Sequence, residues 1–413
     1  MHDHLGNVLT CASLDALQAY EAAVDCHLHA WPDPLVELQE ALAHDPDFAL
    51  AHAAMALVLM ARGRPAEARA AATTARSRLA ALCTREQSHI ALVSLLTEGK
   101  PQQALQAVVE HARHWPTDAL ALSTALGAFG LFAFSGREDH NLARLAFVRE
   151  LAPHYPEDNP WMLTQLSWAH TEAGQPDVGF DLVRRSLALR SANGNAAHVM
   201  VHAHFERGET GEALDFIDDW LPGYPVAAVL VGHLHWHAAL CEIELGQAEA
   251  AERRLLDAIE PHLQHALPLV GMTDMASLLW RLGLQGRPHG PWASAAAYAA
   301  LKFPNGGNAF VEVHLAMLAA AQRDAPALAL CAARLHRLAD AGHGAAPVAL
   351  RWVAGLQAML SGEREGKREG ARVHLQACLD QAVRMGGSHA QRTVVDHTLA
   401  ALELPRAGPA PGS

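Results

Sequence analysis

The chain has 413 residues, of which 51% are hydrophobic and only 6% aromatic, enough apolar material for a large core. Its formal net charge is -13, from 44 acidic and 31 basic residues, and its lysines and arginines form no cluster. Nucleic acids and anionic membranes require clustered positive charge, so the composition argues against both as partners. Abundant helix formers and few β-branched runs predict an all-α fold.

The cysteines and the N-terminus indicate a cytoplasmic protein. Six cysteines lie far apart without a Cys-x-x-Cys pair, which is typical of thiols in a reducing compartment. The first residues lack the basic and then apolar layout of a signal peptide. Residues 119–136 carry no charge, but their serine, threonine and glycine favour a buried helix over a membrane span.

Helical segments alternate along the chain with short breaks. The first junction contains Asp45 and Pro46, and the proline is expected in the first turn of the next helix. A second kind of break, a glycine followed by a helix that opens with Glu-Ala, recurs at Gly63, Gly208 and Gly246. Such a glycine ends the first helix in a left-handed conformation. The pattern predicts stacked pairs of antiparallel helices.

This alternation resembles the tetratricopeptide repeat, and the order of motifs is similar, more narrowly, to the tetratricopeptide repeat protein 38 family. The resemblance spans roughly Asp3 to Leu402 and implies a single tetratricopeptide-like α-α superhelix over residues 1–404, without an agreed activity. Residues 405–413 are predicted to be a disordered Pro/Gly-rich tail. The motifs are Asp3 to Thr10, Phe134-Ser135-Gly136-Arg137, His198-x3-His202, His233-x2-Trp236-His237, Asp274-x2-Ser277, Phe310-x3-His314 and Gly386 to Arg392.

Two histidine pairs, His198/His202 and His233/His237, are the most informative candidates for a site. Each pair is spaced by four residues, and the pairs are offset by 35 residues, about one helical repeat. Residues i and i+4 share one face of a helix, and the first helices of a solenoid line its concave surface. Neighbouring helices lie about 8–10 Å apart, so both pairs can reach one ion.

Neutral imidazoles are good ligands for zinc, nickel, copper and iron. The four histidines are therefore candidate ligands of a divalent metal, the cofactor that the sequence suggests. Asp274 and His314 follow at offsets of 37 and 40 residues and are predicted to face the same groove, where they would bind a ligand. A polar groove without metal, or histidines satisfied inside the core, remain open alternatives.

Arg281, Gln391 and Arg392 are further candidates for ligand binding. The two arginines lie in segments that are otherwise apolar or small, where a guanidinium can clamp a carboxylate or phosphate. An internal salt bridge is the alternative. Gln391 belongs to a short helix that Ser388 is predicted to cap, and a helix N-terminus attracts anions.

Two functions compete on these residues. The first is a binding protein whose groove takes a peptide or a small polar or anionic ligand. The second is a metal-assisted hydrolase or lyase, with Asp274 or Glu312 as general base on a bound water. A closed pocket would favour the enzyme, and an open groove would favour the binding protein. The sequence leaves the oligomeric state open, a homo-oligomer included.

Overall fold

The computed structural model describes residues 1–360 and 365–403, and the predicted tail 405–413 lies outside them. Within the described residues the chain consists of helices and turns, with one isolated bridge between His2 and Val8 and no strand. The all-α prediction is confirmed.

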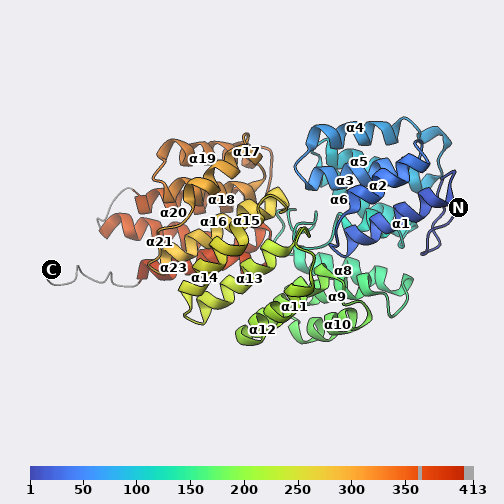
Figure 1. The fold of residues 1–413 in the computed structure, drawn as a ribbon. Helices are drawn as coiled ribbons and strands as arrows, with labels where there is room; N and C mark the ends of the chain where they lie inside the picture. The colour runs from blue at the N-terminus through green and yellow to red at the C-terminus, as the bar shows by residue number, and fades with distance from the viewer. Residues whose placement is uncertain (361–364, 404–413) are drawn as a thin grey trace. The chain divides into compact units, whose positions relative to one another are not determined.

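The chain separates into two compact units. Unit 1 comprises residues 1–135 and 139–271, and unit 2 comprises residues 136–138 and the chain from Met272 onward. Figure 1 shows the helices of both, coloured along the chain. Each unit is described by itself below, and a single solenoid over residues 1–404 stays a prediction.

Unit 1 begins with short helix pairs and ends in the first turn of α16. Its elements are α1 (Leu14–Leu28), α2 (Pro34–His44), α3 (Ala49–Ala61), α4 (Pro65–Arg76), η1 (Leu79–Ala81), α5 (Thr84–Thr97), α6 (Pro101–His114), α7 (Ala119–Ser123), α8 (His140–Leu151), η2 (Ala152–His154), α9 (Pro160–Glu172), α10 (Pro176–Leu189), α11 (Gly194–Glu206), α12 (Thr210–Trp220), η3 (Leu221–Gly223), α13 (Val231–Glu244), α14 (Ala248–Arg254), the π-helical η4 (Leu255–Ile259) and α15 (Glu260–His262).

Unit 2 begins at Met272 within α16 and, like unit 1, consists of helices. Its elements are most of α16 (Pro268–Leu284), α17 (Trp292–Lys302), α18 (Ala309–Ala321), α19 (Ala325–Asp340), α20 (Ala346–Leu360), α21 (Glu365–Leu379), η5 (Ala382–Met385), α22 (His389–Arg392) and α23 (Val394–Glu403).

Consecutive helices pack as antiparallel hairpins, and first helices of successive hairpins also touch. α3 packs on α4, α9 on α10 and α20 on α21, while α3 contacts α5 and α9 contacts α11. The predicted glycine breaks have positive φ angles, 69° at Gly63, 73° at Gly208 and 75° at Gly246. Glycine adopts this conformation without steric cost, so the predicted helix ends are confirmed.

Two local predictions were wrong. Pro46 lies in a turn, and α3 begins only at Ala49, because the Asp45 carboxylate holds the turn through the backbone amides of Ala12 and Asp47 at 2.8 and 3.1 Å. In residues 119–136 only α7 is α-helical, and the rest forms turns around Gly127, whose φ is 78°. Its lack of charge reflects burial in turns, since a turn can also be apolar when its neighbours cover it.

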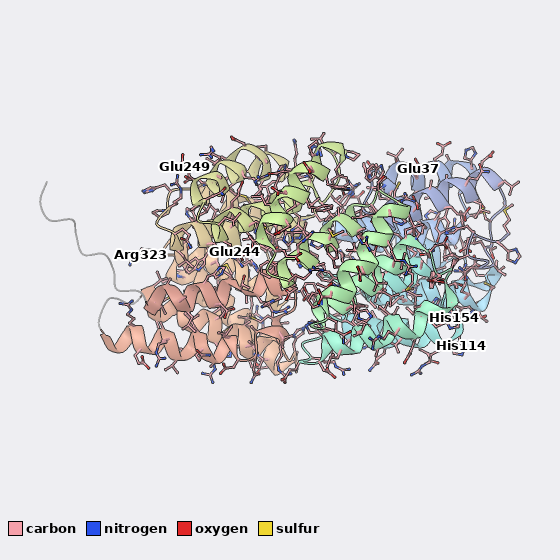
Figure 2. All side chains as sticks on the ribbon, turned by 90° about the horizontal axis from the view of Figure 1, so that it is seen from below. Glu37, His114, His154, Glu244, Glu249 and Arg323 are labelled. Atoms are coloured by element: carbon pink, nitrogen blue, oxygen red, sulfur yellow. The ribbon has the colours of Figure 1, made fainter. Side chains whose placement is uncertain are left out.

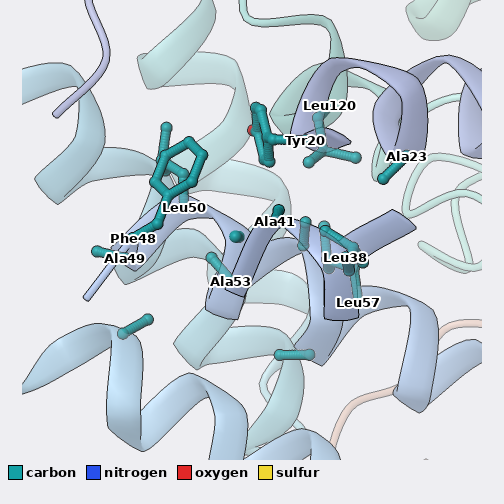
Figure 3. Packing of buried hydrophobic residues seen from close by; sticks show 14 of the residues in the cluster. Tyr20, Ala23, Leu38, Ala41, Phe48, Ala49, Leu50, Ala53, Leu57 and Leu120 are labelled. Carbon is teal, nitrogen blue, oxygen red and sulfur yellow. The ribbon is translucent and has the colours of Figure 1, made fainter. Parts of the chain in front are cut away.

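The core of the N-terminal hairpins shows how the helices approach closely. The rings of Tyr20 and Phe48 lie 4.9 Å apart, and both side chains are buried. Figure 3 shows them with Leu120 and with Ala41 and Ala53, which are small enough for close contact between helices. Alanine at these contacts lets each hairpin nest against the next.

The outside of the helices carries the charge. Glu244, Glu249 and Arg323 are exposed, and so are the histidines His114 and His154 (Figure 2). Within the described part of the chain, no helix combines the length and the apolar character needed to cross a bilayer.

Candidate functional site

Two helices of unit 1, α11 and α13, carry the two histidine pairs (Figure 1). α11 begins cleanly because the Asn193 side chain caps its first turn, accepting a hydrogen bond at 2.9 Å. His198 and His202 are 8% and 0% exposed, and His233 and His237 are 3% and 2% exposed. The exposed histidines elsewhere show that this burial belongs to the position and not to the residue type.

The ring nitrogens of these histidines lie at contact distance. Nε2 of His198 is 3.0 Å from Nε2 of His202 and 3.0 Å from Nε2 of His233. The His237 ring lies 4.6 Å from the His202 ring, centroid to centroid, and 4.7 Å from that of His233. One ring nitrogen each of His198, His202 and His237 also fall within 4.8 Å of one another. We call these four residues the histidine cluster. His198 and His202 belong both to the set with His233 at 3.0 Å and to the set with His237 within 4.8 Å.

The spacing of the ring nitrogens can be compared with what hydrogen bonds and a metal ion each require. A ring nitrogen has a single in-plane position, which holds either a proton or a lone pair. One well-directed hydrogen bond can therefore account for only one of the two contacts of His198 Nε2. An ion among the lone pairs accounts for both, because Zn–N bonds of about 2.0–2.1 Å place tetrahedral ligands about 3.3 Å apart.

Aromatic rings wall the histidine cluster. Trp168 of α9 stacks on His198 with the centroids 5.7 Å apart, and it meets His202 edge-on at 4.8 Å. Trp236 is fully buried and stacks on His233 at 5.3 Å with an interplanar angle of 7°. These contacts fix the ring orientations and keep bulk water away from the nitrogens.

A carboxylate stands behind the cluster. Glu172, at the end of α9, places Oε1 3.7 Å from Nδ1 of His202, and its side chain is 1% exposed. A carboxylate facing the second nitrogen of a ligating histidine orients the ring and raises its basicity. Nε2 of His202 is then the nitrogen that faces the other histidines.

The electrostatics favour the ligating form of the central histidine. Burial, followed by the neighbouring His202 and His233, holds the pKa of His198 well below its ordinary value. The imidazole is therefore neutral at pH 7. Neutral imidazole is the form that binds divalent metals.

Trp168 and Glu172 were missed by the sequence analysis, although a signal for them exists. They are four residues apart, and each precedes its counterpart, His198 or His202, by 30 residues. The side chains at these equivalent positions therefore begin one repeat before the histidine pairs. Extending the repeat register to residues other than histidine would have found both.

Unit 1 holds a second buried group of histidines that the sequence analysis also missed. Asp118 accepts a hydrogen bond from Arg85 Nη1 at 2.5 Å and lies 3.1 Å from His89 Nδ1 and 3.3 Å from His111 Nε2. Burial alone would raise the pKa of Asp118, but His89, His111 and Arg85 outweigh it and hold that pKa well below the ordinary value. Arg85 also donates to the backbone oxygen of Val8 at 2.7 Å, which ties down the N-terminal segment. No regular spacing in the sequence marks this group. We call Asp118, Arg85, His89 and His111 the Asp118 network.

The predicted arginines lie in unit 2 and bind backbone. Arg281 of α16 is 1% exposed, and its Nη2 donates to the carbonyl oxygens of Ala390 and Gln391 at 3.0 and 3.3 Å. Arg392 donates to the Gly387 oxygen at 2.6 Å. Both guanidinium groups therefore help to hold the segment around α22 in place through its carbonyl oxygens.

Gln391 belongs to the cap of α22. Its Oε1 accepts from the Ser388 amide at 3.0 Å, and its own amide donates to Ser388 Oγ at 3.3 Å. This reciprocal pair is a capping box, so the predicted role of Ser388 is confirmed.

The remaining candidates also lie in unit 2. Asp274 and His314 are 1% and 2% exposed, and Nδ1 of His314 is 2.8 Å from the Phe310 oxygen. Burial lowers the pKa of His314 to about 4 against the opposing effect of that carbonyl. Glu312 accepts from the Gly307 amide at 3.0 Å, and burial raises the pKa of its carboxyl. A single groove lined by these residues together with the histidine cluster stays a prediction.

Solved structures resemble this chain at low sequence identity. No family model matches the chain. A tetratricopeptide repeat protein from Parabacteroides merdae is 13% identical over 65% of this chain and 97% of its own, with a TM-score of 0.43. The APC/C hetero-tetramer Cut9-Hcn1 is 11% identical over 96% of this chain and 79% of its own, with a TM-score of 0.45. The human IFIT1 dimer with m7Gppp-AAAA is 12% identical over 95% of this chain and 86% of its own, with a TM-score of 0.46.

The consecutive helix pairs of the described residues agree with the predicted tetratricopeptide-like helical-repeat fold. Identities of this size carry no information on ligands or reactions. The narrower resemblance to the tetratricopeptide repeat protein 38 family stays a prediction.

Proposed function

We propose that unit 1 is a binding module in which the histidine cluster holds a divalent metal ion of the zinc type, and that this ion takes a small polar or anionic ligand. The observation that carries the proposal is the pair of 3.0 Å contacts at Nε2 of His198. His202 supplies the second ligand, and His233 or His237 the third. Glu172 and the two tryptophans orient the rings from outside.

The chemistry of the ligand set indicates which small molecules would bind. Neutral imidazoles do not compensate the two positive charges of the ion, so its open position favours an anionic oxygen. A carboxylate is the simplest such group. Glu172 offsets part of the charge from behind His202.

Burial limits the size of this ligand. None of the four histidines is more than 8% exposed, and His198 has the most accessible edge. An extended peptide cannot lie directly on side chains that are covered to this extent. We therefore assign the small polar or anionic ligand to the histidine cluster, while peptide binding on another concave surface stays a prediction.

Metal-assisted hydrolysis or lyase chemistry would require a general base. The predicted bases, Asp274 and Glu312, both belong to unit 2, and Glu312 already accepts the Gly307 amide. No observation on the described residues favours turnover. Binding is therefore the function that we propose.

The first experiment is elemental analysis and zinc titration of protein purified without a histidine tag. We expect about one equivalent of a divalent metal in the wild type, either as purified or after loading, and none in His202→Gln/His237→Gln. The matched control is His204→Gln/His235→Gln, two histidines on the same helices that lie against Glu209 and Arg254 at 2.8 and 3.3 Å.

The control variant should bind metal as the wild type does. A wild-type protein that is metal-free and takes up no zinc, nickel, manganese or iron would refute the metal centre. Equal loss of metal in both double variants would show that the cluster is not the binding site.

A further inference from the structure

A cavity of about 230 Å³ lies elsewhere in unit 1 and shares no residue with the histidine cluster. It is bordered by the end of α1, the N-terminal segment, the start of α9 and Arg190 after α10. Leu5, Val24, Leu28 and Trp161 provide apolar walls. The volume is below the roughly 300–1,000 Å³ of pockets for drug-sized molecules, so an occupant would have on the order of ten non-hydrogen atoms.

One side of the cavity is a preorganised polar group. Asp25 forms a bidentate ion pair with Arg190, at 2.8 and 2.5 Å. The Nδ1 atom of His29 lies 3.1 Å from the Asp25 carboxylate and 2.9 Å from the Asp25 backbone oxygen. Both of these neighbours are acceptors only, so Nδ1 carries a proton; in a neutral imidazole of this tautomer Nε2 has the lone pair. The ion pair balances its own charge and leaves no net charge for a ligand.

Two polar atoms at this cavity are not used by the fold. Nε2 of His29 and the hydroxyl of Tyr155 have no hydrogen-bond partner among the described residues. The His29 side chain is 8% exposed and Tyr155 is 7% exposed, so both are more than nine-tenths buried. Burial raises the pKa of Tyr155, and its hydroxyl keeps its proton. Buried polar atoms are normally paired, which makes two unpaired ones beside one cavity informative.

We propose that this cavity binds a small uncharged molecule with an apolar, flat body and a hydroxyl group that pairs with His29 and Tyr155. A hydroxyl donates one hydrogen bond and accepts others, so it can donate to Nε2 of His29 and accept from Tyr155. The body would lie against Trp161 and the aliphatic side chains. The balanced Asp25–Arg190 pair disfavours a carboxylate or ammonium group at the same place.

The test uses the full-length protein and three fluorinated probes of nearly equal size, observed by fluorine NMR with a chelator present. 4-Fluorophenol carries the hydroxyl, 4-fluorotoluene lacks it, and 4-fluorobenzoate replaces it by a charge. We expect saturable binding of 4-fluorophenol at one site and at least about tenfold weaker binding of the other two, the effect of one lost hydrogen bond. The chelator separates this site from the metal centre.

Two variants and one control locate the site. Tyr155→Phe should weaken 4-fluorophenol about tenfold without lowering the melting temperature, because the hydroxyl has no partner in the fold. Ala119→Leu narrows the cavity and should weaken all three probes. Tyr298→Phe, in unit 2, should change nothing.

Three outcomes would overturn the proposal. They are no saturable binding of 4-fluorophenol to the wild type, equal binding of 4-fluorophenol and 4-fluorotoluene, and binding that neither Tyr155→Phe nor Ala119→Leu alters. A drop in melting temperature for Tyr155→Phe would show that its hydroxyl serves the fold instead.

Discussion

The two buried histidine groups of unit 1 solve the same problem in opposite ways. In the Asp118 network a carboxylate stands at the centre, and Arg85, His89 and His111 surround it. In the histidine cluster the centre is another imidazole, His198, with His202 and His233 at equal distances. Buried donors need an acceptor, and the first group has one. In the second group imidazole nitrogens face one another, and we propose that a cation is shared among their lone pairs.

The difference teaches how to judge a cluster of histidines. In the group organised around a carboxylate, Asp118 pairs with Arg85, His89 and His111, and this group serves the fold. Where ring nitrogens face one another, as in the histidine cluster, we propose that an added ion is shared among them. The predictions below test this comparison, from the largest expected effect to the smallest.

Asp118→Asn should be the most damaging change. It removes the only acid from the centre of the Asp118 network and leaves the buried charge of Arg85 without its partner, which typically costs about 3–5 kcal/mol. Urea unfolding followed by circular dichroism measures the loss. Asp33→Asn breaks an exposed pair with Arg62 and should cost less than about 0.5 kcal/mol. Similar costs for both variants would contradict the structural role of Asp118.

A third arrangement, a buried histidine against a backbone carbonyl, should show in the pH dependence. The folded-state pKa of His314 is about 4, below its unfolded value near 6.5, so the unfolded chain binds more protons between these values. The free energy of unfolding should therefore fall as the pH drops from 6.5 to 4, by up to roughly 3 kcal/mol from this residue. His314→Leu should flatten the curve over that window. Parallel curves for the variant and the wild type would refute the assignment.

The Asp118 network should respond at lower pH. Its carboxyl has a folded pKa below the unfolded value of 3.8, so its contribution to stability is present above pH 4 and is lost only as the pH falls further. The two windows separate the carboxylate from His314 in one titration.

Zinc should stabilise the protein through the histidine cluster. At a free zinc concentration of 100 times the dissociation constant, linkage predicts a gain of about 2.7 kcal/mol, visible as a higher melting temperature. His202→Gln/His237→Gln should lose this gain, and His204→Gln/His235→Gln should keep it. A shift that is the same in both would place zinc elsewhere.

The smallest effect should come from the histidine cluster without metal. In chelated protein His198→Leu should cost less than about 1.5 kcal/mol, because leucine keeps a similar volume among Trp168 and its neighbours. The same variant should bind no metal. A loss in chelated protein as large as that of Asp118→Asn would mean that the two histidine groups are structural alike.

Much of the fold was predictable because it is local. Glycine at Gly63, Gly208 and Gly246 ends helices through its own φ angle, and Ser388 caps α22 through atoms three residues away. Such signals depend on neighbours in the chain. The wrong start of α3 at Pro46 arose because a longer-range bond, from Asp45 to Ala12, decides that turn.

For the candidate site, too, local features were predictable and contacts between distant segments were not. The sequence by itself determined that His198, His202, His233 and His237 share helix faces in two successive repeats, because helical periodicity and repeat length are chain properties. Only the tertiary structure decided that their nitrogens meet, that Trp168 and Glu172 join them, and that Arg281 and Arg392 bind carbonyls of the segment around α22. Distances between segments far apart in the chain depend on packing, which spacing alone does not specify.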